Sequence, residues 1–245
     1  EVGDRVAWAT GPGSYSGRVA ISADAAVKVP DGIDLEVAAA LPLQGMTAHF
    51  LATSTYPLGP GDRCLIHAGA GGVGLLLIQI AKLRGAEVFT TVGTPEKAEL
   101  ASIAGADYTI LYRDVDFAAA ITEIAGERPL DVVYDGVGKT TFSQGLTLLR
   151  PRGMMVTFGN ASGPVDPIAP LELSANGSLY LTRPTLFHHV RTHAELQGRA
   201  DDLFDWVDSG DLDVRIGARF ALRDAAEAHR ALEARATTGK VLLIP

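Results

Sequence analysis

Three regularly spaced glycines are the residues whose pattern most clearly suggests a chemical role. The segment Ala68-Gly-Ala-Gly-Gly-Val-Gly74 places Gly69, Gly71 and Gly74 in the pattern G-x-G-x-x-G. An expected strand precedes this segment and an apolar helix is expected over 75–84, which is the context of a dinucleotide-binding loop. Gly69 would permit a tight turn, Gly71 a close approach to a pyrophosphate, and Gly74 close packing of the helix on the sheet. The alternative is a glycine-rich turn that binds nothing.

The residues after the second expected strand indicate which dinucleotide would bind. A site for NAD usually has an acid about 20 residues past the glycines, where it binds the ribose 2′-hydroxyl. This sequence has Val92-Gly93-Thr94 there, and Lys97 follows at the start of a helix. A 2′-phosphate would meet an ammonium group and a helix N-terminus, so we expect NADPH. Tyr112 and Arg113 are second candidates, and the alternative for Lys97 is an ordinary surface lysine.

The segments that would position these residues alternate between strands and helices from about residue 63 to 181, a pattern that predicts parallel strands joined by crossover helices. The fold class is therefore α/β with a doubly wound parallel sheet. Strands are expected at 64–67, 88–92, 108–111, 132–135 and 154–158, with another at 178–182. Helices are expected to start near Gly72, Pro95, Asp116 and Thr140.

The two ends of the chain follow a different pattern. Residues 1–35 indicate an irregular β unit, and the last part predicts helices over 192–209 and 224–234 and a closing strand over 240–244. We expect that closing strand to pair with the amino-terminal β unit. The sequence begins without a methionine, so we expect it to be part of a longer chain.

Composition excludes several classes of protein. A chain of 245 residues with 47% hydrophobic residues can bury a large core. The formal net charge of −8 argues against nucleic acid or an anionic membrane as a partner, and a small soluble substrate is expected instead. The single cysteine, Cys64, allows no internal disulfide, which suggests the cytoplasm. No segment is long and apolar enough to predict a membrane helix.

The sequence offers no convincing metal site and no acid/base pair. His188, His189 and His193 lie close together, but no zinc motif surrounds them, and the Cys expected near Gln44 in a zinc enzyme is absent. We therefore expect no metal, and the catalytic residues are unknown. A structural role for Asp135 in a turn is favoured over a role in the site.

Several separated motifs resemble one family of enzymes. They are Glu1-Val-Gly-Asp-Arg-Val6, Leu41-Pro-Leu-Gln-Gly-Met-Thr-Ala48, the glycine loop, Thr91-Val-Gly-Thr-Pro-Glu-Lys97, Val133-Tyr-Asp-Gly-Val-Gly138, Phe158-Gly-Asn-Ala-Ser-Gly163, Leu181-Thr-Arg-Pro184 and Arg235-Ala-Thr-Thr-Gly-Lys240. Together they resemble the zinc-independent, zeta-crystallin-like quinone oxidoreductases of the medium-chain dehydrogenase/reductase superfamily. The resemblance covers almost the whole chain.

The resemblance implies a domain organisation and an activity. It implies a partial GroES-like catalytic domain at 1–43, a Rossmann domain at 44–182 and a return to the catalytic domain at 183–245. The family portion that precedes this sequence completes the barrel and supplies an Asn and a Tyr beside the nicotinamide and substrate. The implied reaction is hydride transfer from NADPH to a quinone or related enone, by a homodimer that pairs through an edge strand near 178–182.

The resemblance also extends the predicted site. It implies that Gly93, Lys97 and Tyr112 hold the 2′-phosphate and that Lys240 lies near the nicotinamide half. With the residues that would line the channel, the predicted cofactor-binding residues are Thr47, Gly69, Gly71, Gly72, Val73, Gly74, Gly93, Lys97, Tyr112, Phe158, Asn160 and Lys240. Two further functions stay open: an enoyl-thioester or enone reductase of the same superfamily, and a non-catalytic NADPH-binding protein that acts as a sensor or binds RNA.

Overall fold

The computed structural model describes residues 1–234 and 236–245. Arg235, which begins the motif 235–240, lies outside the described residues. The chain forms two compact units. Unit 1 comprises Glu1–Phe50, Gly71–Leu76 and Leu186–Pro245, and unit 2 comprises Leu51–Ala70 and Leu77–Thr185.

Unit 2 is built on a parallel sheet whose six strands are ordered β5-β4-β3-β6-β7-β8 in the described part of the chain. Counted along this sheet, the order is 3-2-1-4-5-6, which is that of a doubly wound dinucleotide-binding sheet. The predicted α/β fold class and strands are confirmed. The strands are β3 (Arg63–His67), β4 (Glu87–Val92), β5 (Tyr108–Leu111), β6 (Leu130–Asp135), β7 (Leu149–Thr157) and β8 (Tyr180–Thr182).

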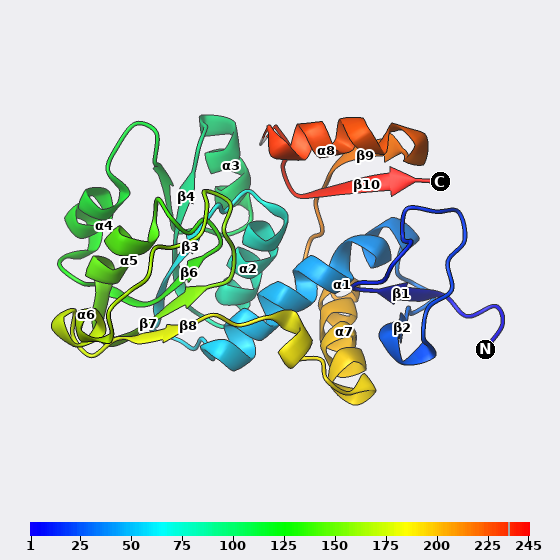
Figure 1. The fold of residues 1–245 in the computed structure, drawn as a ribbon, viewed down its shortest axis with the longest axis horizontal. Coiled ribbons are helices and arrows are strands. Elements are labelled where there is room, and N and C mark those ends of the chain that lie inside the picture. Colours follow the sequence, from blue (N-terminus) through cyan, green and yellow to red (C-terminus); the bar gives the residue numbers. More distant parts are fainter. Residues whose placement is uncertain (235) are drawn as a thin grey trace. The chain divides into compact units, whose positions relative to one another are not determined.

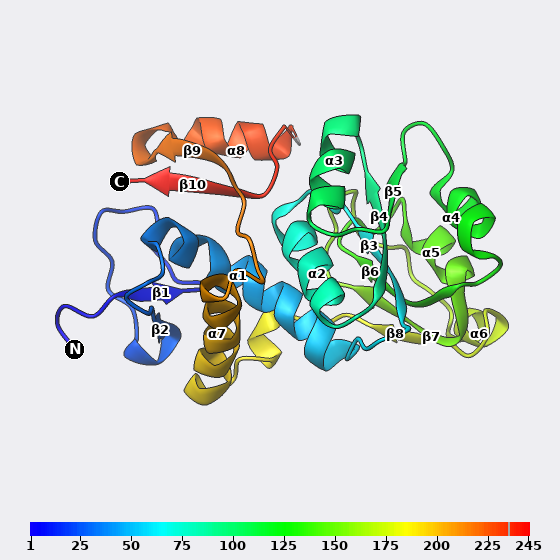
Figure 2. The ribbon, with the colours of Figure 1, turned by 180° about the vertical axis from the view of Figure 1, so that it is seen from behind.

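Helices cover both faces of this sheet (Figures 1 and 2). One face carries α4 and α5, and the other carries α3 and the part of α2 that belongs to unit 2. Thr94 caps α3 and Asp116 caps α4 through bonds from backbone amides three residues on, which satisfy donors that a helix start leaves free. The helices are α2 (Gly72–Leu83), α3 (Pro95–Ile103), α4 (Phe117–Ala125), α5 (Phe142–Leu148) and α6 (Pro170–Ala175), and a π-helical turn, η2, spans Leu51–Thr55.

Burial on both faces explains why the central strands are so apolar. Leu65 of β3, Phe89 of β4 and Val133 of β6 are fully buried and belong to one hydrophobic cluster. A parallel sheet covered by helices needs such strands because neither face meets water.

Asp135 is a structural residue at the end of β6. It is completely buried, and its carboxylate accepts hydrogen bonds from the amides of Val137 at 2.7 Å and Gly138 at 2.9 Å. The Thr141 hydroxyl donates to it as well, at 2.9 Å to Oδ2. These donors compensate the buried charge, and they hold the turn that leads to α5.

Unit 1 combines short strands with two long helices. The strands β1 (Val6–Trp8) and β2 (Ala26–Lys28) pair antiparallel. The helices α1 (Leu35–Phe50) and α7 (His193–Asp208) pack together, and a Cβ on Gly45 of α1 would lie 3.1 Å from a methyl group of Leu203 of α7. A glycine inside α1 therefore permits a close approach of the two helices. The rest of the unit comprises η1 (Ala23–Ala25), η3 (Leu186–His188), β9 (Ile216–Ala221), η4 (Leu222–Asp224), α8 (Ala225–Glu233) and β10 (Lys240–Ile244).

The expected pairing of the closing strand is wrong. Within the described residues, β10 pairs with β9 in parallel, and β1 pairs only with β2. The strand β9 was not predicted from the sequence, and without it the amino-terminal strands are the nearest candidates as partners. The helix α1 was not predicted either, whereas α7 and α8 agree with prediction within a residue or two.

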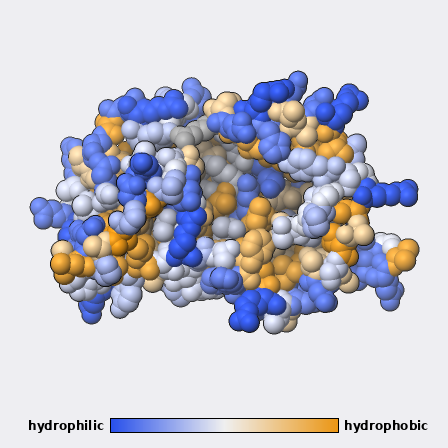
Figure 3. All heavy atoms as spheres, viewed as in Figure 1, coloured by the Kyte–Doolittle hydropathy of each residue, from blue (hydrophilic) through white to orange (hydrophobic). Residues whose placement is uncertain are grey.

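The surface is mostly polar, with apolar side chains exposed in places. Figure 3 shows hydrophilic residues over much of one face with apolar residues among them. None of the helices in the part of the chain that the structure describes has the length and apolar character needed to cross a membrane.

Candidate functional site

The glycine loop begins with a left-handed residue, and that residue is Ala68 rather than a glycine. Ala68 follows β3 directly and has φ 57°, a conformation that costs an L-residue roughly 1–2 kcal/mol. Gly69 does not have a positive φ. The left-handed residue of the turn is therefore Ala68, one position before the first glycine of the pattern. A Cβ on Gly69 would overlap the Thr90 hydroxyl and lie 3.0 Å from Thr90 Cβ, so this position needs a residue without a side chain.

The first amides of the helix that follows are not used in bonds within the helix. The amide of Leu75 donates to Gly71 O at 3.0 Å, so the amides of residues 72–74 precede the first intrahelical bond. Gly71 also forms an isolated parallel β-bridge with Gly239. This bridge places the segment before β10 beside the loop. A Cβ on Gly72 would overlap the side-chain amide of Gln44, so α1 lies directly against the start of α2. Free amides at a helix start form a site suited to phosphate.

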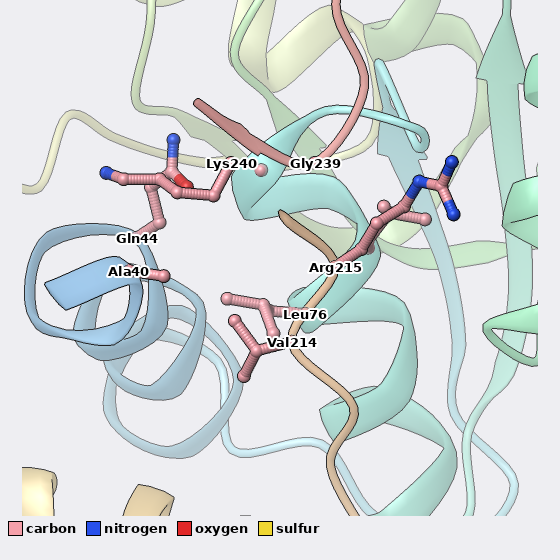
Figure 4. Close-up of a pocket in the computed structure, with 9 residues that line it drawn as sticks. Ala40, Gln44, Leu76, Val214, Arg215, Gly239 and Lys240 are labelled. Carbon is pink, nitrogen blue, oxygen red and sulfur yellow. The ribbon is translucent and has the colours of Figure 1, made fainter. Parts of the chain in front are cut away.

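Lys240 and Gln44 line a pocket beside this helix start, within unit 1. Figure 4 shows the two side chains next to each other, whereas the guanidinium group of Arg215 points away from them. Burial lowers the pKa of the Lys240 ammonium group. The lining residues include no carboxylate. The pocket therefore contains the side chain of a lysine, beside the helix start, and no opposing carboxylate.

His67 and Thr91 lie at the carboxyl ends of β3 and β4. They are register partners, and His67 Nδ1 lies 2.8 Å from Thr91 Oγ1. His67 Nε2 is buried and has no hydrogen-bond partner among the described residues. The ring stands edge-on to Phe117 at 5.0 Å between centroids. Burial lowers the pKa of His67 to about 4, although the Asp135 carboxylate acts in the opposite direction. The imidazole is therefore neutral at physiological pH.

Gly93 brings the end of β4 against the end of β5. A Cβ on Gly93 would lie 3.0 Å from the Tyr112 hydroxyl and 3.4 Å from Arg113 Nε, so both side chains lie over its backbone. On the next helix, the Thr94 hydroxyl accepts from the Lys97 amide at 3.4 Å. The hydroxyl of Thr94 also lowers the pKa of the exposed Glu96 carboxyl by hydrogen bonding to it. Two of the predicted 2′-phosphate residues, Gly93 and Tyr112, therefore meet in the structure.

The loop after β7 holds two more of the predicted residues. The Phe158 ring packs on Gly136, where a Cβ would lie 3.1 Å from its Cζ atom. The Asn160 carbonyl accepts from the Gly163 amide at 3.0 Å, which closes a turn. Arg183 donates to the Gly159 carbonyl at 3.0 Å and thereby holds this loop in place.

The predicted residues fall into groups within each unit. In unit 1, Gly71, Gly72, Val73, Gly74 and Lys240 surround the helix start, and Thr47 lies on α1 with its hydroxyl donating to the Leu43 carbonyl at 2.6 Å. In unit 2, Gly69, Gly93, Lys97, Tyr112, Phe158 and Asn160 follow the carboxyl ends of strands. Gln44 was not predicted, although it lies in the motif 41–48.

His189 and His193 both make contacts with groups that are not metal ligands. The His189 ring stacks on Phe50 at 4.3 Å between centroids, and His193 Nδ1 lies 3.2 Å from the Asp24 carbonyl oxygen. Among the residues that the structure describes, no three His, Cys, Asp or Glu side chains are grouped as metal ligands. Burial also raises the pKa of the Cys64 thiol well above its ordinary value, which disfavours the thiolate form that binds metals.

Comparison with known proteins gives matches that agree with one another. The model of the family described as zinc-binding dehydrogenase matches residues 72–208. A quinone oxidoreductase from Pseudomonas aeruginosa is 48% identical over 100% of this chain and 76% of its own length. A 2-haloacrylate reductase from a Burkholderia species is 43% identical over 100% of this chain and 74% of its own length. The crystal structure of Escherichia coli quinone oxidoreductase complexed with NADPH superposes with a TM-score of 0.91, at 43% identity over 94% of this chain and 72% of that one.

The contact between Gly69 and Thr90 predicts a steric coupling. Thr90 is buried and its hydroxyl donates to the Ile66 carbonyl at 2.6 Å, so it cannot rotate away from an added methyl group. We expect Gly69→Ala to lower the free energy of unfolding by about 1–3 kcal/mol. Denaturant unfolding should show that Gly69→Ala combined with Thr90→Ala costs less than the sum of the single changes. Gly198→Ala, on an exposed helix position with no atom within 4 Å of the added Cβ, is the matched control and should not destabilise. Additive effects at 69 and 90 would contradict the coupling.

The buried neutral His67 predicts a loss of stability in acid. Its folded pKa of about 4 lies below the ordinary 6.5, so between these values the unfolded chain binds a proton that the folded chain does not. The free energy of unfolding should therefore fall as the pH falls from 6.5 towards 4, by up to about 1.4 kcal/mol per pH unit from this residue. Denaturant titrations across this range should give a smaller slope for His67→Asn. If the free energy of unfolding of the two proteins depended equally on pH, His67 would not be the source of the acid sensitivity.

Proposed function

Because the chain belongs to the quinone oxidoreductase family of the medium-chain dehydrogenase/reductase superfamily, we propose that it transfers a hydride from NADPH to a quinone or related enone without a metal. It is an NADPH-dependent oxidoreductase. The observation that carries the proposal is the glycine loop between β3 and α2 in a 3-2-1-4-5-6 sheet, with Gly93 rather than an acid after β4.

The residues of this chain fit a dinucleotide in three places. The amides of residues 72–74 would hold the pyrophosphate, and Lys240, which lines the pocket beside them, would lie near the nicotinamide half. Lys97 and Tyr112 would bind the 2′-phosphate. Phe158 and Asn160, on the loop after β7, would line the channel towards the nicotinamide. Close glycine contacts at 69, 72 and 93 support this fit, because side chains there would fill the space along the backbone.

Bound NADPH supplies the hydride, and the protein then has to orient the acceptor and exclude competing reactions. A quinone needs no Lewis acid because its reduction gives an aromatic diolate, which water can protonate. The main demand on the protein is to place a flat apolar acceptor against the nicotinamide. The donor set supports metal-free chemistry, because Cys64, the only cysteine in the sequence, is buried on β3.

A second candidate acceptor is an activated alkene. The 43% identity to a 2-haloacrylate reductase supports an enone or related unsaturated compound as the substrate. Hydride addition to such a compound also places negative charge on an oxygen atom, which a hydrogen-bond donor beside the acceptor would stabilise. The net charge of −8 gives no support to an RNA-binding role.

The domain assignment and the location are also proposals. We retain a GroES-like catalytic domain formed by 1–43 and 183–245 around a Rossmann domain at 44–182. A cytoplasmic location is consistent with a single buried cysteine and no disulfide.

Replacement of Lys97 tests the cofactor proposal. Losing a charge-assisted contact to the 2′-phosphate should weaken NADPH binding by about 1.5–3 kcal/mol in Lys97→Ala. NADH lacks that phosphate, so its binding should change little. Fluorescence titration of both nucleotides with both proteins measures the difference. If wild type binds NADPH and NADH equally well, the proposed preference is wrong.

We also propose a homodimer that pairs through β8, the last strand of the sheet. This strand bonds only to β7 within the described residues, and Tyr180 on it is 58% exposed, so its outer edge is available to a second copy. Equilibrium sedimentation should give a dimer, and Tyr180→Arg should shift it towards monomer. A wild-type monomer at micromolar concentration would refute the proposal, and Tyr112→Arg, at another exposed tyrosine, is the control.

A further inference from the structure

Arg113 is a cation in unit 2 that forms no ion pair with the described residues. It follows β5 and is exposed, and no carboxylate or carbonyl oxygen in the described part of the chain accepts a hydrogen bond from its guanidinium group. From the sequence, Arg113 is only a second candidate for a contact with the 2′-phosphate. The structure gives its side chain a defined place, because Nε lies 3.4 Å from the position of a Cβ on Gly93.

The register of two parallel strands brings Arg113 to this place. Val92, the last residue of β4, is the register partner of Leu111, the last residue of β5. The amide of Tyr112 then donates to the Val92 carbonyl at 3.2 Å, which extends the pairing beyond the strands. The segments that follow β4 and β5 therefore leave the sheet side by side, and the side chains of the two residues after β5 lie over Gly93. Without a side chain of its own, Gly93 allows both the phenol and the guanidinium group to approach its backbone.

The charges around Gly93 suit an anion with several oxygen atoms. β4 ends at Val92 and is followed by Gly93 and Thr94, neither of which is a carboxylate, and Lys97 lies on the first turn of the next helix. Two acids lie close by along the chain, and both are exposed: Glu96, whose carboxylate bonds the Thr94 hydroxyl, and Asp114, which follows Arg113 and forms no ion pair with it. A planar guanidinium group can donate two parallel hydrogen bonds to one phosphate, which an ammonium group cannot do.

We propose that Arg113 is a third direct contact of the cofactor's 2′-phosphate, beside Lys97 and Tyr112, and that it contributes to the selection of NADPH over NADH. This inference rests on the proposed function, since it requires the adenosine half of NADPH to lie over Gly93. Lys97 would neutralise charge from the helix side and Arg113 from the β5 side. The phosphate would therefore be bound between two cations on neighbouring elements of one unit.

The test uses two fragments of the cofactor that differ by the phosphate in question. Adenosine 2′,5′-bisphosphate carries it and adenosine 5′-monophosphate lacks it, and both require only the adenosine site. Calorimetric titration of the whole protein in low salt should show that Arg113→Ala weakens binding of the bisphosphate roughly five- to thirtyfold. This is a loss of about one to two kcal/mol of binding free energy. Binding of the monophosphate should change less than about twofold. Arg113→Lys, which keeps the charge but not the two-pronged geometry, should give an intermediate loss.

The controls separate this role from two others. Arg223→Ala removes an equally charged, 87% exposed arginine from unit 1 and should leave both affinities unchanged, so a general charge effect would be recognised. If Arg113→Ala weakens both fragments equally, the guanidinium group stacks on the adenine or supports the fold, and the inference is wrong. If it weakens neither, Arg113 does not touch the cofactor, and the inference is again wrong.

The same titrations distinguish failure of the inference from failure of the proposed function. If wild type prefers the bisphosphate and Lys97→Ala removes that preference while Arg113→Ala does not, the NADPH site stands and only the role of Arg113 is overturned. If wild type does not prefer the bisphosphate at all, the proposed cofactor preference and the role of Arg113 are both overturned.

Discussion

The hydrogen-bonded register of β3, β4 and β5 determines where the residues of the candidate site lie. His67 pairs with Thr91, and Val92 pairs with Leu111, so the three strands end at one edge of the sheet. Two of the strands then leave the sheet through residues with little or no side chain: Ala68 and Gly69 follow β3, and Gly93 follows β4. A shift by one residue would turn every side chain to the opposite face and would separate these groups.

Close backbone approach is the common reason for the site glycines. Gly69 approaches Thr90 within unit 2, Gly72 approaches Gln44 within unit 1, and Gly93 approaches Tyr112. None of these three has the left-handed conformation, which at the loop is adopted by Ala68 instead. The small residues along the predicted phosphate path therefore reduce the distance between neighbouring elements. The conformational cost falls on an alanine, and such strain is common near functional sites.

The alternating sheet and its helices could be predicted from the sequence because local signals agree there. Apolar β-branched runs mark the strands, and Thr94 and Asp116 mark helix starts with capping side chains. The helix α1 could not be predicted in the same way, because Pro42 and Gly45 disfavour a helix interior and only the packing of α7 on Gly45 explains the glycine. The pairing of β9 with β10 joins segments on either side of α8, and pairing between strands leaves little local trace in a sequence. In the candidate site, the glycine pattern and Lys97 could be found from spacing, whereas the positions of Gln44 and Arg113 depend on tertiary contacts.

The complete burial of Cys64 has a practical consequence. Cys64 lies in β3 between two strands, three residues before His67, and it is the only thiol in the sequence. A thiol reagent can reach it only when the centre of the sheet opens, so the rate of its modification reports the frequency of that opening. Since the glycine loop continues directly from this strand, a nucleotide that binds the loop should slow the labelling. The native chain thus contains its own chemical probe for how firmly a bound dinucleotide holds the sheet closed.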